Sequence, residues 1–393
     1  MAERAAKKTG TNQVGPVVEV TRHITQAVRC MLWGKAAGRC QFSGCNKLLL
    51  KHPVTQEQVN IAQAAHIYAF SEEGPRGNEG VDKDKLNDLN NLMLACHACH
   101  KTMDQDKEGD RYSVELLKRW KAEHERRVET VTGIDPTKNS HVLLYDANIG
   151  KHGSPLNYVE AAHALFPDYY PAADGPIELG MTNSSYNDSE DIFWDIEAEQ
   201  LQREFTEKVL ERVRNGKIGH LSVFGLAPQP LLIKLGTLLV DILPAQVYQR
   251  YREPTPTWEW PDSDATLDLK VRRPERYDGQ PALVIGLTAK VADNRITSAL
   301  PDACIWTVTT SEPGHDHIRS PDDLSIFRSK VRKLMDEIKS RHGQDTPLHI
   351  FPVAGNAVNI ELGRIRMPKA MMPWFLYDQV NKRGGFVRGL EIN

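Results

Sequence analysis

The sequence lacks an excess of charge of either sign. Its 393 residues include 49 Lys and Arg and 52 Asp and Glu, which leaves a formal net charge of −3 at pH 7. A chain with this balance is not a histone-like cation, so contact with nucleic acid would need a local basic patch. Gly and Pro are scattered rather than clustered, which argues against collagen-like repeats and long disordered segments.

Long apolar runs are also missing. Residues 1–15 carry Lys and Arg without an apolar core, unlike a secretory signal. The most apolar stretch, residues 221–247, is interrupted by prolines and charges such as Pro228, Lys234 and Pro244, so it does not read as a membrane span. In a chain of this kind cysteines are more often thiols or metal ligands than disulfides. The sequence therefore predicts a cytoplasmic chain that does not contact a membrane.

Cysteine is scarce beyond the first hundred residues, where only Cys304 remains. A helix with Ser113 as its N-cap is expected to run to about residue 131, because apolar residues recur there at helical spacing. Gly133 and Pro136 then end the helix and open a linker. We therefore expect a first domain over residues 1–135 and a second over residues 136–393.

The early cysteines form two short-spaced pairs. Cys40 and Cys45 are separated by four residues, Cys96 and Cys99 by two, and about fifty residues lie between the pairs. Two such pairs satisfy the tetrahedral demand of a structural zinc ion. Because four thiolates close the coordination shell, this Zn²⁺ would hold the fold and take no part in catalysis.

Three polar residues stand between and just after these pairs. His66 ends an apolar-alternating stretch, Asn91 lies five residues before Cys96, and His100 directly follows Cys99. This combination resembles an HNH endonuclease of the ββα-metal type, over roughly residues 30–130. The resemblance implies a hydrolase that cuts double-stranded DNA with Mg²⁺ or another divalent cation.

The resemblance also implies roles for these residues. Neutral imidazole is suited to deprotonating water near pH 7, so His66 is expected to be the general base. Asn91 is expected to orient His66 or to join the metal shell. His100 would bind the catalytic cation, with Asp104 one helical turn further as a second ligand. Many relatives carry an aspartate before the first histidine where this chain has Ala65, which leaves the ligand set open.

Basic residues near the motif are candidates for DNA phosphates. Arg76 and Lys101 are expected to contact the phosphate backbone. The terminal helix adds a basic stretch over residues 118–127, for which DNA contact and plain solvation carry equal weight.

The second segment alternates short apolar runs with amphipathic helices, which predicts an α/β fold. It contains no GxxxxGK[ST] or GxGxxG phosphate loop and no recognisable Ser-His-Asp order. A weak internal repeat relates residues 221–236 to residues 348–363 at an offset of 127. Two related halves would create a ligand site at their pseudo-twofold axis.

Several stretches of this segment resemble the SAVED domain, a cyclic-oligonucleotide sensor of antiphage signalling systems. They are residues 348–354, 362–364 and 373–378, with Phe224-Gly225 and residues 287–290. The resemblance implies two fused CARF-like Rossmann halves and a cyclic di- or trinucleotide ligand. Ligands of open α/β sheets sit beyond the carboxyl ends of the strands. The residues expected to contact the ligand there are Lys290 for a phosphate, Trp258 or Trp260 as a stacking lid, and Phe224, Gln229, Thr309, Thr310 and Asn356.

The whole sequence therefore resembles an HNH–SAVED effector nuclease of a cyclic-oligonucleotide-based antiphage signalling system (CBASS). A nucleotide messenger would assemble protomers into a homo-oligomer and turn on DNA cleavage. Two alternatives stay open: a restriction-type HNH endonuclease whose second domain reads DNA sequence, and a catalytically dead, zinc-dependent DNA-binding regulator. The first predicts constitutive site-specific cutting, and the second predicts binding without cleavage.

Overall fold

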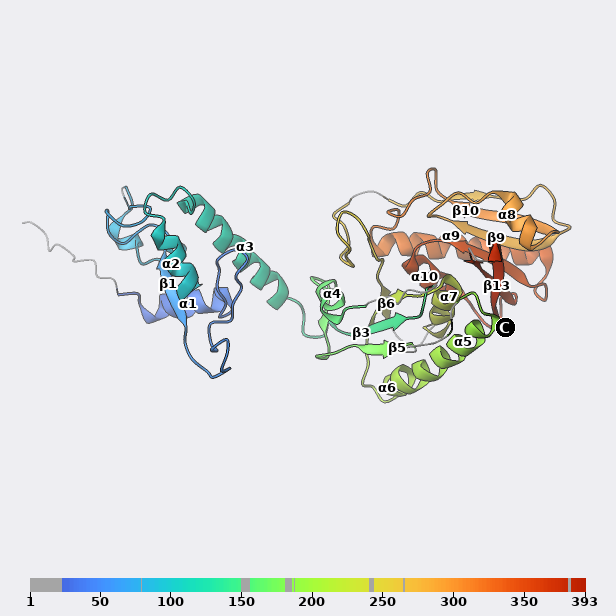
Figure 1. Ribbon diagram of the computed structural model, residues 1–393, viewed down its shortest axis with the longest axis horizontal. Helices are drawn as coiled ribbons and strands as arrows, with labels where there is room; N and C mark the ends of the chain where they lie inside the picture. The colour runs from blue at the N-terminus through green and yellow to red at the C-terminus, as the bar shows by residue number, and fades with distance from the viewer. Residues whose placement is uncertain are drawn as a thin grey trace, which may run out of the picture. The chain divides into compact units, whose positions relative to one another are not determined.

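The structure is a computed structural model in which the chain divides into two compact units between Gly133 and Ile134 (Figure 1). It describes residues 23–78, 80–149, 156–180, 186, 188–239, 244–263, 266–380 and 383–393. The N-terminal residues inspected for a secretory signal lie outside these ranges. Within the described ranges, none of the helices combines the length and the apolar character that crossing a bilayer requires.

The first unit is built around two short antiparallel strands and a helix that follows them directly. Its elements are α1 (Gln26–Ala36), β1 (Ala62–His66), the 3₁₀ turns η1 (Lys83–Lys85) and η2 (Leu89–Asn91), β2 (Leu92–Cys96), α2 (His97–Gln105) and α3 (Val114–Thr132). β2 is buried along its whole length, and its pairing sets Ala62 opposite Cys96 and His66 opposite Leu92. The β1–β2–α2 succession has the ββα order that the sequence predicted.

The long helix α3 starts where the sequence predicted. The Ser113 hydroxyl accepts a hydrogen bond from the Leu116 amide at 3.2 Å, which satisfies one of the free N–H groups of the first turn. Leu117 of α3 and Leu32 of α1 lie in the same buried core as β2. Helices and strands of this unit therefore share one small apolar core, which includes Cys40 and Cys96.

The second unit contains two mostly parallel sheets. The six-stranded sheet has the order β13 (Gly385–Ile392), β12 (Trp374–Val380), β11 (Leu348–Val353), β9 (Gln280–Gly286), β10 (Ala303–Thr309) and β8 (Lys270–Arg272). The other sheet runs β4 (Tyr170–Pro171), β3 (Asn139–Asp146), β6 (Leu221–Leu226) and β7 (Ala245–Val247), and β5 (Ile177–Leu179) also pairs with β3. The inner strands are parallel and buried, as expected for an α/β fold.

Helices complete this unit, and two of them lie between the sheets. The helices are α4 (Tyr158–His163), α5 (Asp191–Phe205), α6 (Glu211–Arg214), α7 (Gln229–Leu238), α8 (Asp293–Ala299), α9 (Pro321–His342) and α10 (Asn356–Ile365). α7 and α10 pack side by side; α10 contacts β6 and β7, and α7 contacts β11, β12 and β13 (Figure 1).

The repeat seen in the sequence occupies equivalent elements. β6 and β11 begin 127 residues apart, and so do α7 and α10. Each strand–helix segment is followed by a strand parallel to the first, β7 in one half and β12 in the other. The two halves therefore meet through α7 and α10.

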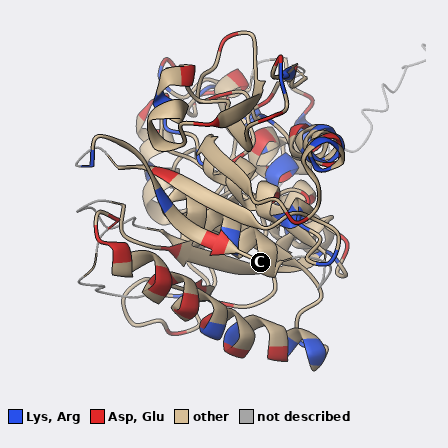
Figure 2. Cartoon of the chain, turned by 90° about the vertical axis from the view of Figure 1, so that its right-hand side faces the viewer, with Lys and Arg blue, Asp and Glu red and all other residues tan. Residues whose placement is uncertain are grey.

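Charge on this unit is mixed. Figure 2 shows acidic and basic residues along the same exposed helices. Such a surface agrees with the small net charge, so binding of a charged ligand would depend on local groups rather than on the charge of the whole unit.

Candidate functional site

The four early cysteines come together in the first unit. Cys40 and Cys45 lie in the loop after α1, Cys96 ends β2 and Cys99 lies in the first turn of α2. Their sulfurs all lie within 4.8 Å of one another, and the Cys45 and Cys96 Sγ atoms are 4.0 Å apart. The Cys96 amide donates to Cys40 Sγ at 3.3 Å, which favours a thiolate there.

This cluster has the chemistry of a metal site. Burial raises the pKa of Cys40 to about 11, because a thiolate away from water is disfavoured. A bound divalent cation reverses this preference, since it neutralises the thiolates that ligate it. Four sulfur donors in a closed set suit a structural ion and leave no open position for a substrate.

His66 lies at the end of β1 and is half-buried. Its Nε2 lies 3.1 Å from Oδ1 of Asn87, and its ring meets the edge of Phe70 at a centroid distance of 5.9 Å. The register of the hairpin places it opposite Leu92, the residue after Asn91. Asn87 has no place in the motif from which the site was predicted.

Asn91 is buried and holds backbone. Its Oδ1 accepts from the Tyr68 amide at 2.7 Å, and its Nδ2 donates to the carbonyls of Tyr68 at 3.2 Å and Leu86 at 2.9 Å. These bonds use both ends of the amide. Asn91 therefore holds the backbone at Tyr68, two residues after His66, and its Oδ1 accepts from the Tyr68 amide.

His100 and Asp104 lie one turn apart on α2. Their Nε2 and Oδ2 atoms are 3.5 Å apart, and both side chains are partly exposed. An imidazole and a carboxylate side by side can hold a divalent cation whose remaining positions go to water or phosphate oxygens. Ala65 is buried beside His66, and its methyl side chain offers no ligand atom.

Arg76 does not face solvent, contrary to the expectation of a phosphate contact. Its side chain is 3% exposed, and its Nε and Nη1 donate to the carbonyls of Ile67 at 2.8 Å and Met103 at 2.9 Å. Its Nη2 lies 3.2 Å from the His66 carbonyl and 3.3 Å from Asp104 Oδ1. Four of its five N–H groups donate within the protein, and together they join the end of β1 to the end of α2.

The other basic residues predicted to contact DNA fall into two groups, those exposed to solvent and those paired within the protein. Lys101 is exposed on α2, one residue after His100. Lys118 on α3 lies 4.8 Å over the ring of Tyr68, close to the loop that follows His66. Lys121 is buried in an ion pair with Glu125, and Arg127 donates to Asn46 Oδ1 at 2.7 Å, so these two stabilise the fold.

In the second unit a cavity of about 720 Å³ lies beyond the carboxyl ends of β6 and β11, where α7 and α10 begin. Both halves line it, which places it where the sequence expected a ligand. The lining includes Leu226, Ala227, Gln229, Gln249, Arg250, Arg252, Thr288, His315, Ala354, Asn356, Asn359, Asp378 and Gln379.

Two predicted residues of this cavity, Gln229 and Asn356, brace the halves against each other. Gln229 Oε1 accepts from the Ala354 amide at 3.0 Å, across the two halves. Asn356 reaches the opposite way, accepting from the Arg250 amide at 3.0 Å and donating to the Tyr248 carbonyl at 2.9 Å. They form the wall of the cavity, and their polar groups are already paired.

The charged groups of the cavity are ones that the sequence analysis missed. Arg250 lies 3.0 Å from Glu160 and stacks over Trp258, whereas Arg252 is exposed and has no ion pair in the described part of the chain. Burial raises the pKa of Asp378 to about 7, so this carboxyl on β12 is partly protonated near neutrality. The repeat could have indicated Asp378, since it aligns this residue with Gln249, which also lines the cavity, but it gave no signal for Arg252.

The remaining predicted ligand contacts lie elsewhere. Phe224 and Trp258 are buried against each other in the core, where their rings have no free face for a base. Trp260 lines a neighbouring cavity of about 510 Å³. Thr309 donates to the Gly286 carbonyl at 2.7 Å, and Thr310 is buried near His317. Lys290 is exposed and outside the cavity lining.

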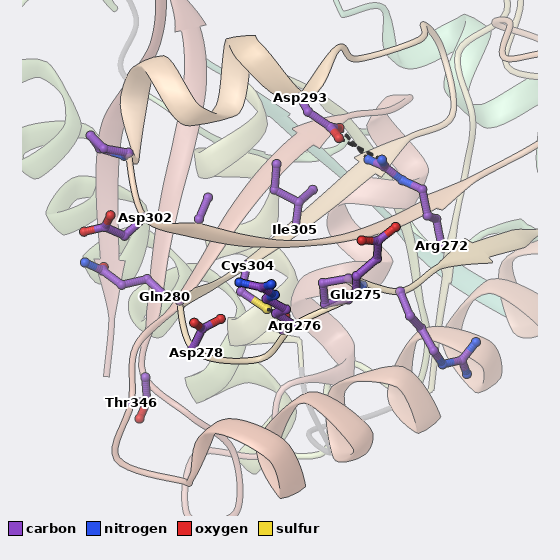
Figure 3. Close-up of a pocket in the computed structure, with 15 residues that line it drawn as sticks. Arg272, Glu275, Arg276, Asp278, Gln280, Asp293, Asp302, Cys304, Ile305 and Thr346 are labelled. Carbon is purple, nitrogen blue, oxygen red and sulfur yellow. Dashed lines mark hydrogen bonds and ion pairs between the residues drawn. The ribbon is translucent and has the colours of Figure 1, made fainter.

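A larger hollow, of about 960 Å³, opens at the opposite ends of β9 and β10 (Figure 3). Arg272 lies there in a hydrogen-bonded pair with Asp293, and Arg273 pairs with Glu337. Asp278, Asp302 and Glu275 add further negative charge. Two of its three lining arginines are paired with carboxylates, and it lies away from the carboxyl ends of the strands, so it is the weaker candidate for an anionic ligand.

The geometry of the two units defines a class of protein: a ββα unit with the residues of a phosphodiester hydrolase, followed by an α/β unit that can sense a ligand. Comparison of sequences agrees with this division. Residues 40–107 match the HNH endonuclease family, and residues 201–392 match SAVED, the SMODS-associated sensor domain fused to various effectors. The chain therefore carries an HNH endonuclease domain followed by a SAVED domain.

Solved structures resemble this chain only distantly. The Acinetobacter baumannii Cap4 SAVED/CARF-domain containing receptor with the cyclic trinucleotide 2′3′3′-cAAA is 11% identical, with a TM-score of 0.44 over 75% of this chain and 66% of the receptor. The Moraxella osloensis Cap4 receptor is 12% identical, with a TM-score of 0.39 over 80% of this chain and 71% of that chain. No curated protein sequence matches the chain.

Proposed function

We propose that this protein is a cyclic-nucleotide-activated, metal-dependent endonuclease for double-stranded DNA that acts as a CBASS effector. One observation carries the catalytic part of the proposal. Arg76 Nη2 contacts both the carbonyl of His66 and the carboxylate of Asp104. One buried cation therefore holds β1, which carries the proposed base, next to α2, which carries the proposed metal ligands.

The residues of this site divide the work of phosphodiester hydrolysis. His66 takes a proton from the attacking water, a role for which a neutral imidazole is suited. His100 and Asp104 would hold the divalent cation. Bound there, such a cation stabilises the negative charge that develops on the phosphate and the leaving oxygen. Lys101 and Lys118, both on the solvent side of the same unit, would contact phosphates of the DNA.

The four cysteines would hold a structural Zn²⁺. Its support is the approach of all four sulfurs to within 4.8 Å of one another. Closing these loops fixes the start of α2, on which His100 and Asp104 lie. The zinc would thus position the catalytic helix while it takes no part in the reaction.

The cavity of the second unit would bind the cyclic di- or trinucleotide. Its place between two repeated halves suits a ligand of approximate twofold or ring symmetry, and Arg252 can meet a phosphate. Binding would draw on both halves at once, since Gln229 and Asn356 already connect them across the cavity wall. Ligand-driven assembly of protomers would then activate the nuclease.

The catalytic assignment is tested by plasmid digestion with the full-length protein, Mg²⁺ or Mn²⁺, and a panel of cyclic di- and trinucleotides. His66→Ala should lower the cleavage rate by about 10²–10⁴-fold, the usual contribution of a general base. His97→Ala is the matched control, because His97 is exposed on the same helix as His100. Both variants should keep the zinc content of the wild type by metal analysis.

The outcomes separate the alternatives. Cleavage by His66→Ala at the wild-type rate would remove His66 from the reaction. DNA binding by the wild type without cleavage under any metal or ligand would favour a catalytically dead regulator. Site-specific cutting that needs no small molecule would favour a restriction-type enzyme.

A further inference from the structure

We propose that Asn87 is a positioning residue that fixes the tautomer of His66, so that Nε2 carries the proton and Nδ1 is the nitrogen that accepts a proton from water. This inference rests on the proposed nuclease function, because it refines the state of the base. Asn87 lies between η1 and η2, outside the sequence motif.

The hydrogen bonds of Asn87 determine which way its amide faces. Its Nδ2 donates to the His23 carbonyl at 3.5 Å, and a carbonyl can only accept. Its Oδ1 therefore faces the His66 ring, 3.1 Å from Nε2. Since an amide oxygen also can only accept, Nε2 must be the protonated nitrogen of a neutral ring. The lone pair is then left on Nδ1.

The backbone around Asn87 is held firmly enough for this contact to matter. The Leu86 carbonyl accepts from Asn91 Nδ2 at 2.9 Å, so the residue before Asn87 is tied to the same amide that holds Tyr68. Phe70 meets the His66 ring edge-on. The strand end, the aromatic edge and the Asn87 amide together restrict the orientation of the imidazole.

Loss of this contact should cost activity without removing the base. A free neutral imidazole populates both tautomers and more than one orientation, so only part of the molecules would present the correct lone pair. Positioning partners of catalytic groups typically contribute about 10–100-fold to activity. Asn87→Ala should lower kcat within this range and leave KM for DNA nearly unchanged.

The direct test is the ¹⁵N spectrum of the histidines in the full-length protein, with His66→Gln to assign the signal. In the wild type, the His66 signals should show a protonated Nε2 and an unprotonated Nδ1. In Asn87→Ala they should move toward the averaged pattern of two exchanging tautomers. This readout needs neither a metal nor cleavage.

Two further variants sharpen the test. Asn87→Asp keeps an acceptor at the ring, so it should retain the Nε2–H tautomer and restore most of kcat at high pH. Its carboxylate also stabilises the imidazolium, so the acid limb of the rate profile should move to higher pH by about one unit or more. Asn90→Ala is the matched control, because Asn90 is an exposed asparagine on η2.

Wild-type His66 protonated on Nδ1, or an unchanged spectrum and kcat in Asn87→Ala, would overturn the proposal. Failure of the nuclease function would show differently. The tautomer signature would then respond to Asn87 as described, while His66→Ala would cleave DNA like the wild type.

Discussion

Arg76 is among the most constrained side chains near the nuclease site. Its guanidinium donates to three backbone carbonyls and meets one carboxylate, all within the protein. A buried guanidinium is tolerated only when its donors are paired, and here the pairing joins two elements that carry catalytic groups. The position therefore serves the geometry of the site, and we propose that exposed lysines such as Lys101 contact the DNA.

In the sensor cavity, we predict that Arg252 binds the ligand and Lys290 does not. Arg252→Ala should raise the Kd for the cyclic nucleotide by about 10-fold or more, because a charge-assisted hydrogen bond contributes about 1.5–3 kcal/mol. Lys290→Ala should change the Kd less than about twofold, since Lys290 lies outside the lining. Calorimetry with the full-length protein measures both. A loss of affinity in Lys290→Ala alone would contradict this arrangement.

The predictable residues were those fixed by spacing. The cysteine pairs, His66, Asn91 and His100 follow from a local motif whose separations carry chemical meaning. Asn87 and Arg252 do not, because each depends on contacts between segments that no local spacing specifies. Arg76 was misassigned for a related reason, since a sequence shows that an arginine is charged but not that three carbonyls surround it.

The helices α7 and α10 approach each other through glycine. A Cβ on Gly363 would lie 2.0 Å from the Ile233 carbonyl, and one on Gly236 would lie 2.0 Å from the Ile360 carbonyl. Gly236 and Gly363 occupy equivalent places in the repeat, as do Ile233 and Ile360. The contact is therefore symmetric, and glycine is required at both positions because the opposing atoms are backbone.

Gly363→Ala should separate these helices and destabilise the second unit. We expect a loss of at least about 1–3 kcal/mol in the free energy of unfolding, the usual cost of forcing atoms into a packed core. Gly219→Ala is the control, because nothing lies near its Cβ position and its φ is not positive. Urea unfolding of the full-length variants measures the difference. Equal stability of the two would contradict the close helix contact.

The elements themselves were largely predictable, and their side-chain surroundings were not. Buried apolar runs indicated the parallel strands, and the repeat indicated equivalent halves with a cavity between them. The choice of Trp258 as a lid failed because aromatic residues that follow a strand can pack inward as well as cover a ligand. Trp258 packs inward against Phe224, and whether such a residue packs inward or covers a ligand depends on tertiary contacts.

For the whole molecule, we propose that a latent nuclease is joined to a sensor that has its own core. An unregulated DNA endonuclease would damage the genome of its host, so the inactive state must dominate without ligand. Moving a population from 1% to 99% active requires that the ligand favour the active state by about 5.5 kcal/mol. A cavity formed by two halves could supply such a difference, because a ligand bound there would contact both halves.

The most direct measurement is the cleavage of plasmid DNA by the full-length wild-type protein with Mg²⁺, in the absence and presence of each cyclic di- and trinucleotide of a panel. The account predicts negligible cutting without ligand. It predicts rapid cutting with at least one member of the panel, at a concentration that rises when Arg252 is replaced by Ala. Cutting that is equally fast with and without every ligand would contradict the account.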